Sequence, residues 1–268
     1  MIWNLGSINV DHFYNVASLP SAGETVSAIG YAQGLGGKGA NMSVAAARGG
    51  ARVAHIGLIG KDGAWVRNRL LEYGVDVSHI AVTDAPTGQA VVCVEASGEN
   101  SIVVLPGTNH ALREEMIGGA LSNARTGDFL LMQNETNGQV RAAELAKALG
   151  LRVAYAAAPF EADAVQDLLP NTDLLVLNEV EAEQLLRTTG TELSQLPVKD
   201  IVVTLGASGC RWYSSRIEKP VEMAAYPVEV VDTTGAGDTF TGFLLAALDR
   251  GEEMRAALDL ALRAAALM

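Results

Sequence analysis

The sequence predicts an α/β fold in which helices cover both faces of a mainly parallel sheet. Beyond Gly39, short apolar runs rich in Val and Ile alternate with helix-like segments, and this alternation is typical of βα units. A chain of 268 residues can bury a sizeable core without disulfides or metal ions. Because no repeat, low-complexity tract or linker interrupts the chain, we expect a single domain over residues 1–268.

The expected elements follow one another along the whole chain. Strands are predicted at 2–5, 26–33, 53–58, 129–132, 152–156, 173–177 and 201–205. Helices are predicted at 42–48, 65–73, 140–149, 162–169 and 179–187. Residues 235–268 predict two further helices that separate at Arg250 and Gly251, because a glycine there can end the first helix.

Two stretches depart from this alternation and predict a small β lid. In the N-terminal part, turn signals at Pro20 and Gly23 lie between β-like runs. Residues 75–104 contain three more β-like runs, which turn sequences separate into hairpins. These runs are 80–82, 89–95 and 101–104. We therefore expect lid strands from about 11–34 and 80–104.

Charge and apolar content exclude two classes of partner. The chain has 19 Lys and Arg against 31 Asp and Glu, a formal net charge of −12, and no basic run that could hold a phosphate backbone. Its apolar runs are shorter than the ~20 residues that span a bilayer. We therefore expect neither a nucleic-acid partner nor a membrane partner.

Cysteine usage and the N-terminal residues predict a cytoplasmic protein. Cys93 and Cys210 each lie in an apolar, strand-like stretch without CxxC spacing, so we interpret both as reduced thiols packed in the core. Residues 1–9 carry no cationic region and include the first predicted strand, so no cleaved secretory signal is expected.

A glycine-rich loop near the C-terminus carries the clearest chemical signal. Residues 228–232 predict a strand, and 233–237 form a small-residue loop that opens the following helix. Helix N-termini present unpaired backbone N–H groups that can bind a phosphate. Asp238, in the first turn, could accept a proton from an attacking hydroxyl while these N–H groups neutralise the phosphoryl group. The alternative interpretation of Asp238 is an ordinary N-cap.

Polar residues at other predicted strand ends suggest that this loop belongs to a larger cleft. Glycines at 34–39 would let backbone amides and Asn41 approach a polyhydroxyl ligand, with Lys38 either binding that ligand or facing solvent. The polar residues at two further strand ends are Gln133, Asn134, Glu135, Asn178 and Glu181. Each of them alone is explained as well by a helix cap or a solvated loop. Together they favour a shared cleft, because open α/β sheets bind ligands at this edge.

Two other patterns carry less weight. The glycines at 57–63 lack the GxGxxG spacing of a dinucleotide-binding loop, which leaves an NAD-dependent dehydrogenase as a remote alternative. The four histidines are far apart in sequence and lack ligand spacing, so neither a metal cluster nor a Ser/His/Asp triad is predicted.

Three segments resemble, in order and spacing, the ribokinase (PfkB) family of carbohydrate kinases. They are LGSINVD at 5–11, GGKGAN at 36–41 and DTTGAGDTF at 232–240. NEVE at 178–181 resembles the NxxE motif of that family, and TLGASG at 204–209 resembles its nucleotide loop. The resemblance covers nearly the whole chain. It implies a ribokinase-like three-layer sandwich with a mainly parallel central sheet and a small β lid.

The resemblance implies transfer of the γ-phosphoryl group of ATP to a primary hydroxyl of a sugar. Asp238 matches the catalytic base, and the amides of Gly235, Ala236 and Gly237 match the anion hole. The positions that match sugar contacts are Asn9, Asp11, Gly37, Lys38, Asn41, Glu135 and Asp238. The positions that match ATP contacts are Asn178, Thr204, Gly206, Gly209 and Gly237.

The resemblance also implies metal ions and a dimer. Glu181 matches a residue that orders Mg²⁺ through water, and Asp232 and Thr234 match the start of a monovalent-cation loop. ATP and Mg²⁺ are therefore expected cofactors, with K⁺ as a further candidate. Family members usually continue beyond the position of Met268 into a strand and loop that supply cation ligands, so this end of the family fold is expected to be missing. The lid is expected to pair two subunits as a homodimer.

Several acceptors remain open at this point. D-ribose, converted to ribose 5-phosphate, is the leading expectation, because Asn9, Asp11 and residues 36–41 favour ribose. Another sugar or a nucleoside is the alternative within the family, since lid positions decide the acceptor. A non-catalytic sugar- or nucleotide-binding relative is the alternative from another class. The presence of Asp238 argues against it, whereas the missing C-terminal stretch argues for it.

Overall fold

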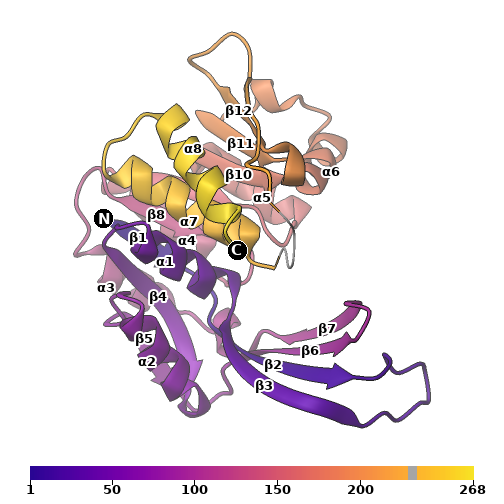
Figure 1. The fold of residues 1–268 in the computed structure, drawn as a ribbon. Coiled ribbons are helices and arrows are strands. Elements are labelled where there is room, and N and C mark those ends of the chain that lie inside the picture. The colour runs from indigo at the N-terminus through magenta and orange to yellow at the C-terminus, as the bar shows by residue number, and fades with distance from the viewer. Residues whose placement is uncertain (229–233) are drawn as a thin grey trace.

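Nine strands form the central sheet of the computed structural model, which describes residues 1–228 and 234–268 (Figure 1). In spatial order they are β13 (Val221–Met223), β12 (Cys210–Ser214), β11 (Asp200–Thr204), β10 (Leu174–Asn178), β9 (Arg152–Ala156), β8 (Phe129–Met132), β1 (Ile2–Leu5), β4 (Val53–Gly60) and β5 (Ile80–Thr83). The strands from β11 to β5 are parallel, and β12 and β13 are antiparallel to their neighbours. The predicted α/β class with a mainly parallel sheet is confirmed.

Helices cover both faces of this sheet, as predicted. One layer consists of α1 (Lys38–Arg48), α2 (Ala64–Glu72), α7 (Ala236–Asp249) and α8 (Met254–Ala265). The other consists of α3 (Glu114–Leu121), α4 (Gln139–Ala148), α5 (Ala162–Leu168) and α6 (Glu179–Thr189). In β10, Leu174 packs toward the first layer and Leu175 toward the second, because successive side chains of a strand point to opposite faces. Strands buried on both faces explain the uninterrupted apolar runs in the sequence.

Four strands form the lid, which projects from one side of the body (Figure 1). Their order is β3 (Ala28–Gly36), β2 (Asn9–Val16), β6 (Gly88–Glu95) and β7 (Asn100–Leu105). The expectation that the run at 80–82 belongs to the lid is wrong. This run is β5, which pairs with β4 in the central sheet. The physical reason is burial, since Ile80 packs in the core with Val75 and Val77.

Most of the other predicted elements lie where expected, within a few residues. Helix α3 and strand β13 were not predicted, and β12 was expected only as a strand-like stretch around Cys210. Short 3₁₀ helices lie at Lys61–Gly63, Gly107–His110, Leu169–Asn171, Leu193–Gln195 and Gly206–Ser208. Apart from Val228, the strand predicted at 228–232 lies outside the described residues. Cys210 is buried as expected, but Cys93 is only partly buried, because it lies in the thin lid sheet rather than in the core.

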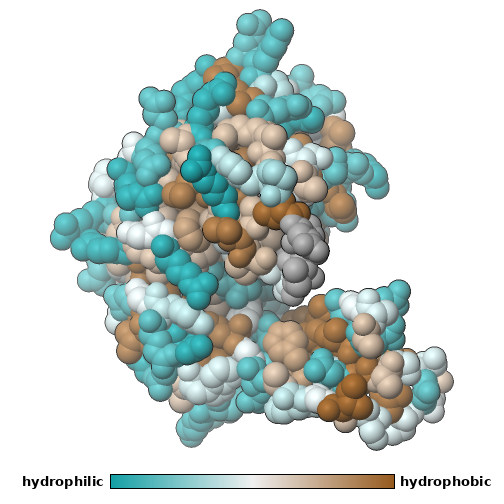
Figure 2. Space-filling view, in the orientation of Figure 1, coloured by the Kyte–Doolittle hydropathy of each residue, from teal (hydrophilic) through white to brown (hydrophobic). Residues whose placement is uncertain are grey.

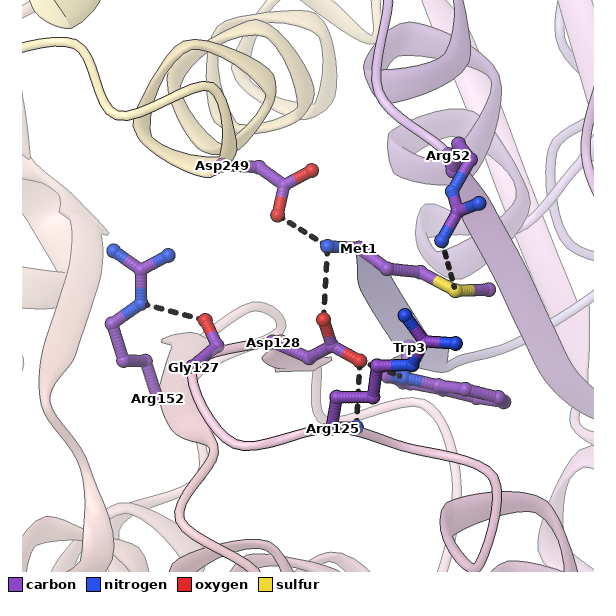
Figure 3. Close-up of polar contacts among 8 residues, drawn as sticks. All are labelled: Met1, Trp3, Arg52, Arg125, Gly127, Asp128, Arg152 and Asp249. Carbon is purple, nitrogen blue, oxygen red and sulfur yellow. Dashed lines mark hydrogen bonds and ion pairs between the residues drawn. The ribbon is translucent and has the colours of Figure 1, made fainter.

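A polar cluster fixes the start of strand β1 of the central sheet (Figure 3). The amino group of Met1 lies 3.1 Å from Asp128 Oδ1 and 2.5 Å from Asp249 Oδ1. The indole nitrogen of Trp3 donates to Asp128 Oδ2 at 3.1 Å. These contacts join β1, the segment before β8 and the end of α7.

No helix within residues 1–228 and 234–268 combines the length and apolar character needed to cross a membrane.

Helices α1 and α7 approach each other closely at Gly242. A Cβ atom on Gly242 would lie 2.5 Å from Ala45 Cβ and 2.8 Å from Met42 O, so a side chain at this position would push the helices apart. This close approach matters for the site, because Asn41 of α1 and Asp238 of α7 lie one turn away from it along each helix.

We expect Gly242→Ala to lower the free energy of unfolding by ~1–3 kcal/mol, because it overpacks this helix crossing. Urea denaturation measures the effect. The matched control is Gly118→Ala in α3, where a Cβ would meet no atom within 4 Å. That substitution should raise the free energy of unfolding by ~0.5–1 kcal/mol, because alanine is the better helix former. Equal effects of the two substitutions would contradict the role of Gly242.

Candidate active site

Four segments converge at the carboxyl ends of the parallel strands. They are the turn after β1, the start of α1, the turn after β8 and the start of α7. Ser7 Oγ donates a hydrogen bond to Glu135 Oε2 at 2.5 Å, and the backbone N–H of Lys38 donates to the same oxygen at 2.9 Å. Glu135 therefore holds the first turn of α1 against the end of β1.

Asp238 lies in the first turn of α7 and is only 7% exposed. Asn41 Nδ2 donates to its Oδ2 at 3.0 Å, and Lys38 Nζ lies 3.9 Å from its Oδ1. Burial raises the pKa of the Asp238 carboxyl, and Glu135 adds to the increase, whereas Lys38 and Asn41 oppose it. The carboxylate is thus held by two side chains of α1 while its affinity for a proton is increased.

The loop before Asp238 presents open backbone at the N-terminus of α7. Gly235 is the N-cap residue and has a left-handed φ of 76°, which glycine adopts without strain. No side chain of the described residues caps this helix. Asp238 is the third residue of the helix and accepts from Asn41, so the alternative interpretation of it as the N-cap is wrong. A Cβ on Gly237 would meet no atom within 4 Å, which leaves room for a ligand to approach.

Asp11 lies on β2 and has one carboxylate oxygen that no described residue satisfies. Its Oδ1 is buried and has no hydrogen-bond partner among the described residues. Burial and the nearby charge of Glu135 raise the pKa of Asp11 from 3.8 to about 6. A side chain on Gly36 would overlap the Asp11 carboxylate, so the glycine makes room for it. A buried acceptor of this kind suits a hydroxyl donor from a ligand.

Asn9 lies at the start of the same strand and is anchored on one side. Asn109 Nδ2 donates to Asn9 Oδ1 at 2.8 Å, while Asn109 Oδ1 accepts the backbone N–H of Ile8 at 2.9 Å. These bonds leave the Asn9 amide nitrogen without a partner among the described residues. Gly37 has a φ of 90° and packs against Ser7, so it sets the turn into α1. Sequence reasoning missed Asn109, because a single Asn in a short 3₁₀ helix carries no motif.

Asn178 and Glu181 form a reciprocal capping box at the start of α6. Glu181 N donates to Asn178 Oδ1, and Asn178 N donates to Glu181 Oε2, both at 2.8 Å. Their contacts are thus those of a helix cap, which was the alternative interpretation. Burial also raises the pKa of Glu181, and it is within electrostatic reach of Lys38 and Asp238. The cap therefore faces the same site.

The predicted nucleotide loop lies beside this cap. Thr204 pairs with Asn178 in the parallel register of β10 and β11, and its Oγ1 donates to Leu177 O at 3.4 Å. Gly206 has a φ of 55° and open space around it. Gly209 is different, since a Cβ there would overlap the backbone at Met223 and Ala225. Close packing of the chain is enough to require glycine at 209.

A cleft of about 690 Å³ opens between the lid, α1, α7 and α8, and the surface is hollowed between body and lid (Figure 2). Asp11, Asn41, Thr234 and Gly235 line it. Three arginines also line it: Arg48, Arg69 and Arg263. Asp232, the other predicted cation ligand, lies outside the described residues. Within residues 1–228 and 234–268, no group of three or more His, Cys, Asp or Glu is placed to hold a metal ion.

A comparison with known protein families identifies the family of this chain. The chain matches the pfkB family of carbohydrate kinases over residues 1–268. It belongs to this family. The predicted membership is confirmed, and the chain is a phosphotransferase with an alcohol group as acceptor.

Similar proteins cover nearly all of the chain. The ribokinase of Haemophilus influenzae is 39% identical over an alignment of 262 positions, which covers 91% of this chain and 84% of that protein. The crystal structure of the Cryptococcus neoformans ribokinase with ADP has a TM-score of 0.82 and 31% identity, over 99% of this chain and 92% of the other. The Arabidopsis thaliana ribokinase with ribose and ATP has a TM-score of 0.84 and 30% identity, over 99% and 91%.

The raised pKa of Asp11 predicts how stability depends on pH. Between about pH 4 and 6 the folded chain binds more protons at Asp11 than the unfolded chain. The free energy of unfolding therefore falls as the pH rises from about 4 to 6, because the buried carboxyl loses its proton. Asp11→Asn removes the charge. We expect it to unfold at a higher urea concentration than the wild type at pH 7 without ligand, and the difference to vanish toward pH 4. A difference that does not change with pH would contradict this origin.

Proposed function

We propose that the chain is an ATP-dependent kinase that transfers the γ-phosphoryl group to the primary hydroxyl of D-ribose. The observation that carries the proposal is Asp238, a buried carboxylate of raised pKa held by Asn41 and Lys38 next to an open helix N-terminus. The names of the similar proteins support ribose and ATP as the two substrates. The product would be ribose 5-phosphate.

The proposed chemistry separates proton transfer from charge stabilisation. Asp238 accepts the proton of the attacking hydroxyl. The backbone amides of Gly235, Ala236 and Gly237 stabilise the negative charge on the transferred group, because the N-terminus of a helix attracts anions. Lys38 offsets further negative charge from a position 3.9 Å from Asp238.

The sugar and the nucleotide occupy different sides of Asp238 in this proposal. The proposed sugar contacts are Asn9, Asp11, Gly37, Lys38, Asn41 and Glu135. The proposed nucleotide contacts are Asn178, Thr204, Gly206, Gly209 and Gly237. The unsatisfied Oδ1 of Asp11 supports the first group, and the open backbone at Gly206 and Gly237 supports the second.

The residues present fit Mg²⁺ that arrives with the nucleotide rather than a metal held by the protein alone. Glu181 uses Oε2 in the capping box and leaves Oε1 for metal-bound water. Mg²⁺ supplies positive charge that neutralises the phosphates. Of the two proposed K⁺ ligands, Thr234 lines the cleft and Asp232 lies outside the described residues.

Asp238→Asn tests the proposed base. The amide oxygen can still accept from Asn41, so sugar and ATP should bind as in the wild type, while turnover falls by ~10²- to 10⁴-fold. A coupled assay of ADP release with ribose measures turnover, and calorimetry measures both affinities. Turnover within about threefold of the wild type would exclude Asp238 as the base. No ADP release by the wild type with any sugar or nucleoside would favour the non-catalytic alternative.

Asp11→Ala tests the acceptor side. Deleting a carboxylate that accepts a sugar hydroxyl should lower kcat/KM for ribose by ~10- to 100-fold and leave the KM for ATP unchanged. The same assay across pentoses, hexoses and nucleosides identifies the acceptor. If ribose fails while a hexose or nucleoside is phosphorylated, the kinase assignment survives and the ribose assignment does not. An effect on ATP alone would mean that the two sides are reversed.

We also propose a homodimer that forms through the lid. All six residues of β7 are exposed, and the lid carries Ile29 and Val103 at 75% and 67% exposure. Apolar side chains gather on the lid in the space-filling view (Figure 2). The lid also ends in open edge strands, β3 and β7, which a second subunit would cover.

A cytoplasmic location is proposed as well, supported by the free thiols of Cys93 and Cys210.

Light scattering tests the dimer. The wild type at micromolar concentration should have twice the 28.0 kDa mass of the chain, and Val103→Lys should shift it toward the monomer because it places a charge in the interface. Val82→Lys is the control, since Val82 is 50% exposed on β5, outside the lid. A monomeric wild type would refute the proposal.

A further inference from the structure

Four polar side chains form a continuous hydrogen-bonded chain beneath the candidate site. They are Asn4, Ser43, His55 and Gln133, and each is at most 1% exposed. Such groups are costly to bury inside an apolar core unless they are hydrogen-bonded. They come from β1, α1, β4 and the turn after β8, so they lie where these elements meet.

The hydrogen-bond partners fix the direction of every proton in this chain. His55 Nε2 lies 3.0 Å from Gly6 O, and a carbonyl can only accept, so Nε2 carries the hydrogen. Nδ1 is then an acceptor, and the Ser43 hydroxyl donates to it at 2.8 Å. Burial lowers the pKa of His55 to about 4, which keeps the ring neutral in this arrangement at physiological pH.

The same reasoning extends to the other end. Asn4 Nδ2 donates one hydrogen to Ser43 Oγ and the other to Gly39 O, both at 2.7 Å. Gln133 Nε2 donates to Asn4 Oδ1 at 3.0 Å. The protons therefore all point one way, from Gln133 through Asn4, Ser43 and His55 to the Gly6 carbonyl. Each link depends on the one before it, because Ser43 accepts from one neighbour and donates to the other.

The two backbone groups that this chain holds are those on which the site depends. A Cβ on Gly6 would lie 2.6 Å from Gly39 Cα, so the two backbones are in contact. Gly6 precedes Ser7, and Gly39 follows Lys38, and both Ser7 and Lys38 bind Glu135. Asn41, which contacts Asp238, lies in the same turn of α1.

We infer that Asn4, Ser43 and His55 are positioning residues for the sugar half of the site. They act by locking the contact between Gly6 and Gly39 and thereby the first turn of α1. This inference rests on the proposed function. The nucleotide half is not held in this way, because none of the four side chains hydrogen-bonds to β10 or β11, which carry Asn178 and Thr204.

Ser43→Ala breaks the chain in the middle and is the central test. It leaves His55 Nδ1 and one Asn4 hydrogen unpaired, so the first turn of α1 should shift. We expect the KM for the sugar to rise ~5- to 100-fold and the KM for ATP to stay within about twofold. The matched control is Thr172→Ala, which also removes a buried, hydrogen-bonded hydroxyl, two residues before β10. It should alter stability but neither KM.

A second pair of variants separates positioning from folding. His55→Leu removes both ring nitrogens, whereas the amide of His55→Gln can still donate to Gly6 O. The glutamine variant should therefore recover part of the loss in sugar KM. If Ser43→Ala does not fold, this pair decides the question. Equal changes in the KM of both substrates, or none in either, would refute the inference.

Hydrogen exchange provides a measurement that does not depend on activity. The amide of Ala40 bonds to Ser7 O at 2.9 Å, and the amide of Gly39 bonds to Ser7 Oγ at 3.2 Å. Both should exchange at least ~10-fold faster in Ser43→Ala than in the wild type or in Thr172→Ala. If the wild type has no kinase activity, the proposed function fails, and this measurement still decides whether the buried chain positions α1. Unchanged exchange would refute the positioning role.

Discussion

The contact between the backbones of Gly6 and Gly39 is the constraint on which the candidate site depends. It brings the end of β1 against the first turn of α1 with no side chain between them. Ser7 and Lys38 can then share one oxygen of Glu135. Asn41 reaches Asp238 only because α1 and α7 also cross closely, at Gly242. Three glycines thus set the distances among the charged groups.

The sequence was a good guide to what depends on local pattern. The spacing of apolar residues and the local composition predicted most elements of the central sheet. The small-residue loops predicted where charged groups meet. Position 80–83 shows the limit, because a short apolar run looks alike in a lid hairpin and in a buried parallel strand. Only the packing of Ile80 against Val75 and Val77 distinguishes them.

The buried polar residues could not be predicted for a related reason. Asn4 and His55 interrupt apolar strands, and a single polar residue in such a run has many explanations. Asn109 lies in a short 3₁₀ helix without a motif and bonds to Asn9, 100 residues earlier in the chain. Their partners become visible only when the fold brings distant segments together. A capping box such as that of Asn178 and Glu181 can be recognised in the sequence, because both partners lie within one helical turn.

The site gathers more negative charge than it neutralises, and this imbalance is informative. Asp11, Asp238 and Glu181 all have a raised pKa from burial, and Lys38 is the cation that opposes the increase for both Asp238 and Glu181. Stability alone would not select such an arrangement, because each buried carboxylate is desolvated. A ligand that donates hydroxyl protons and brings its own cations would relieve the repulsion. The substrates proposed for this chain, a sugar and a nucleotide that carries Mg²⁺, have both of these properties.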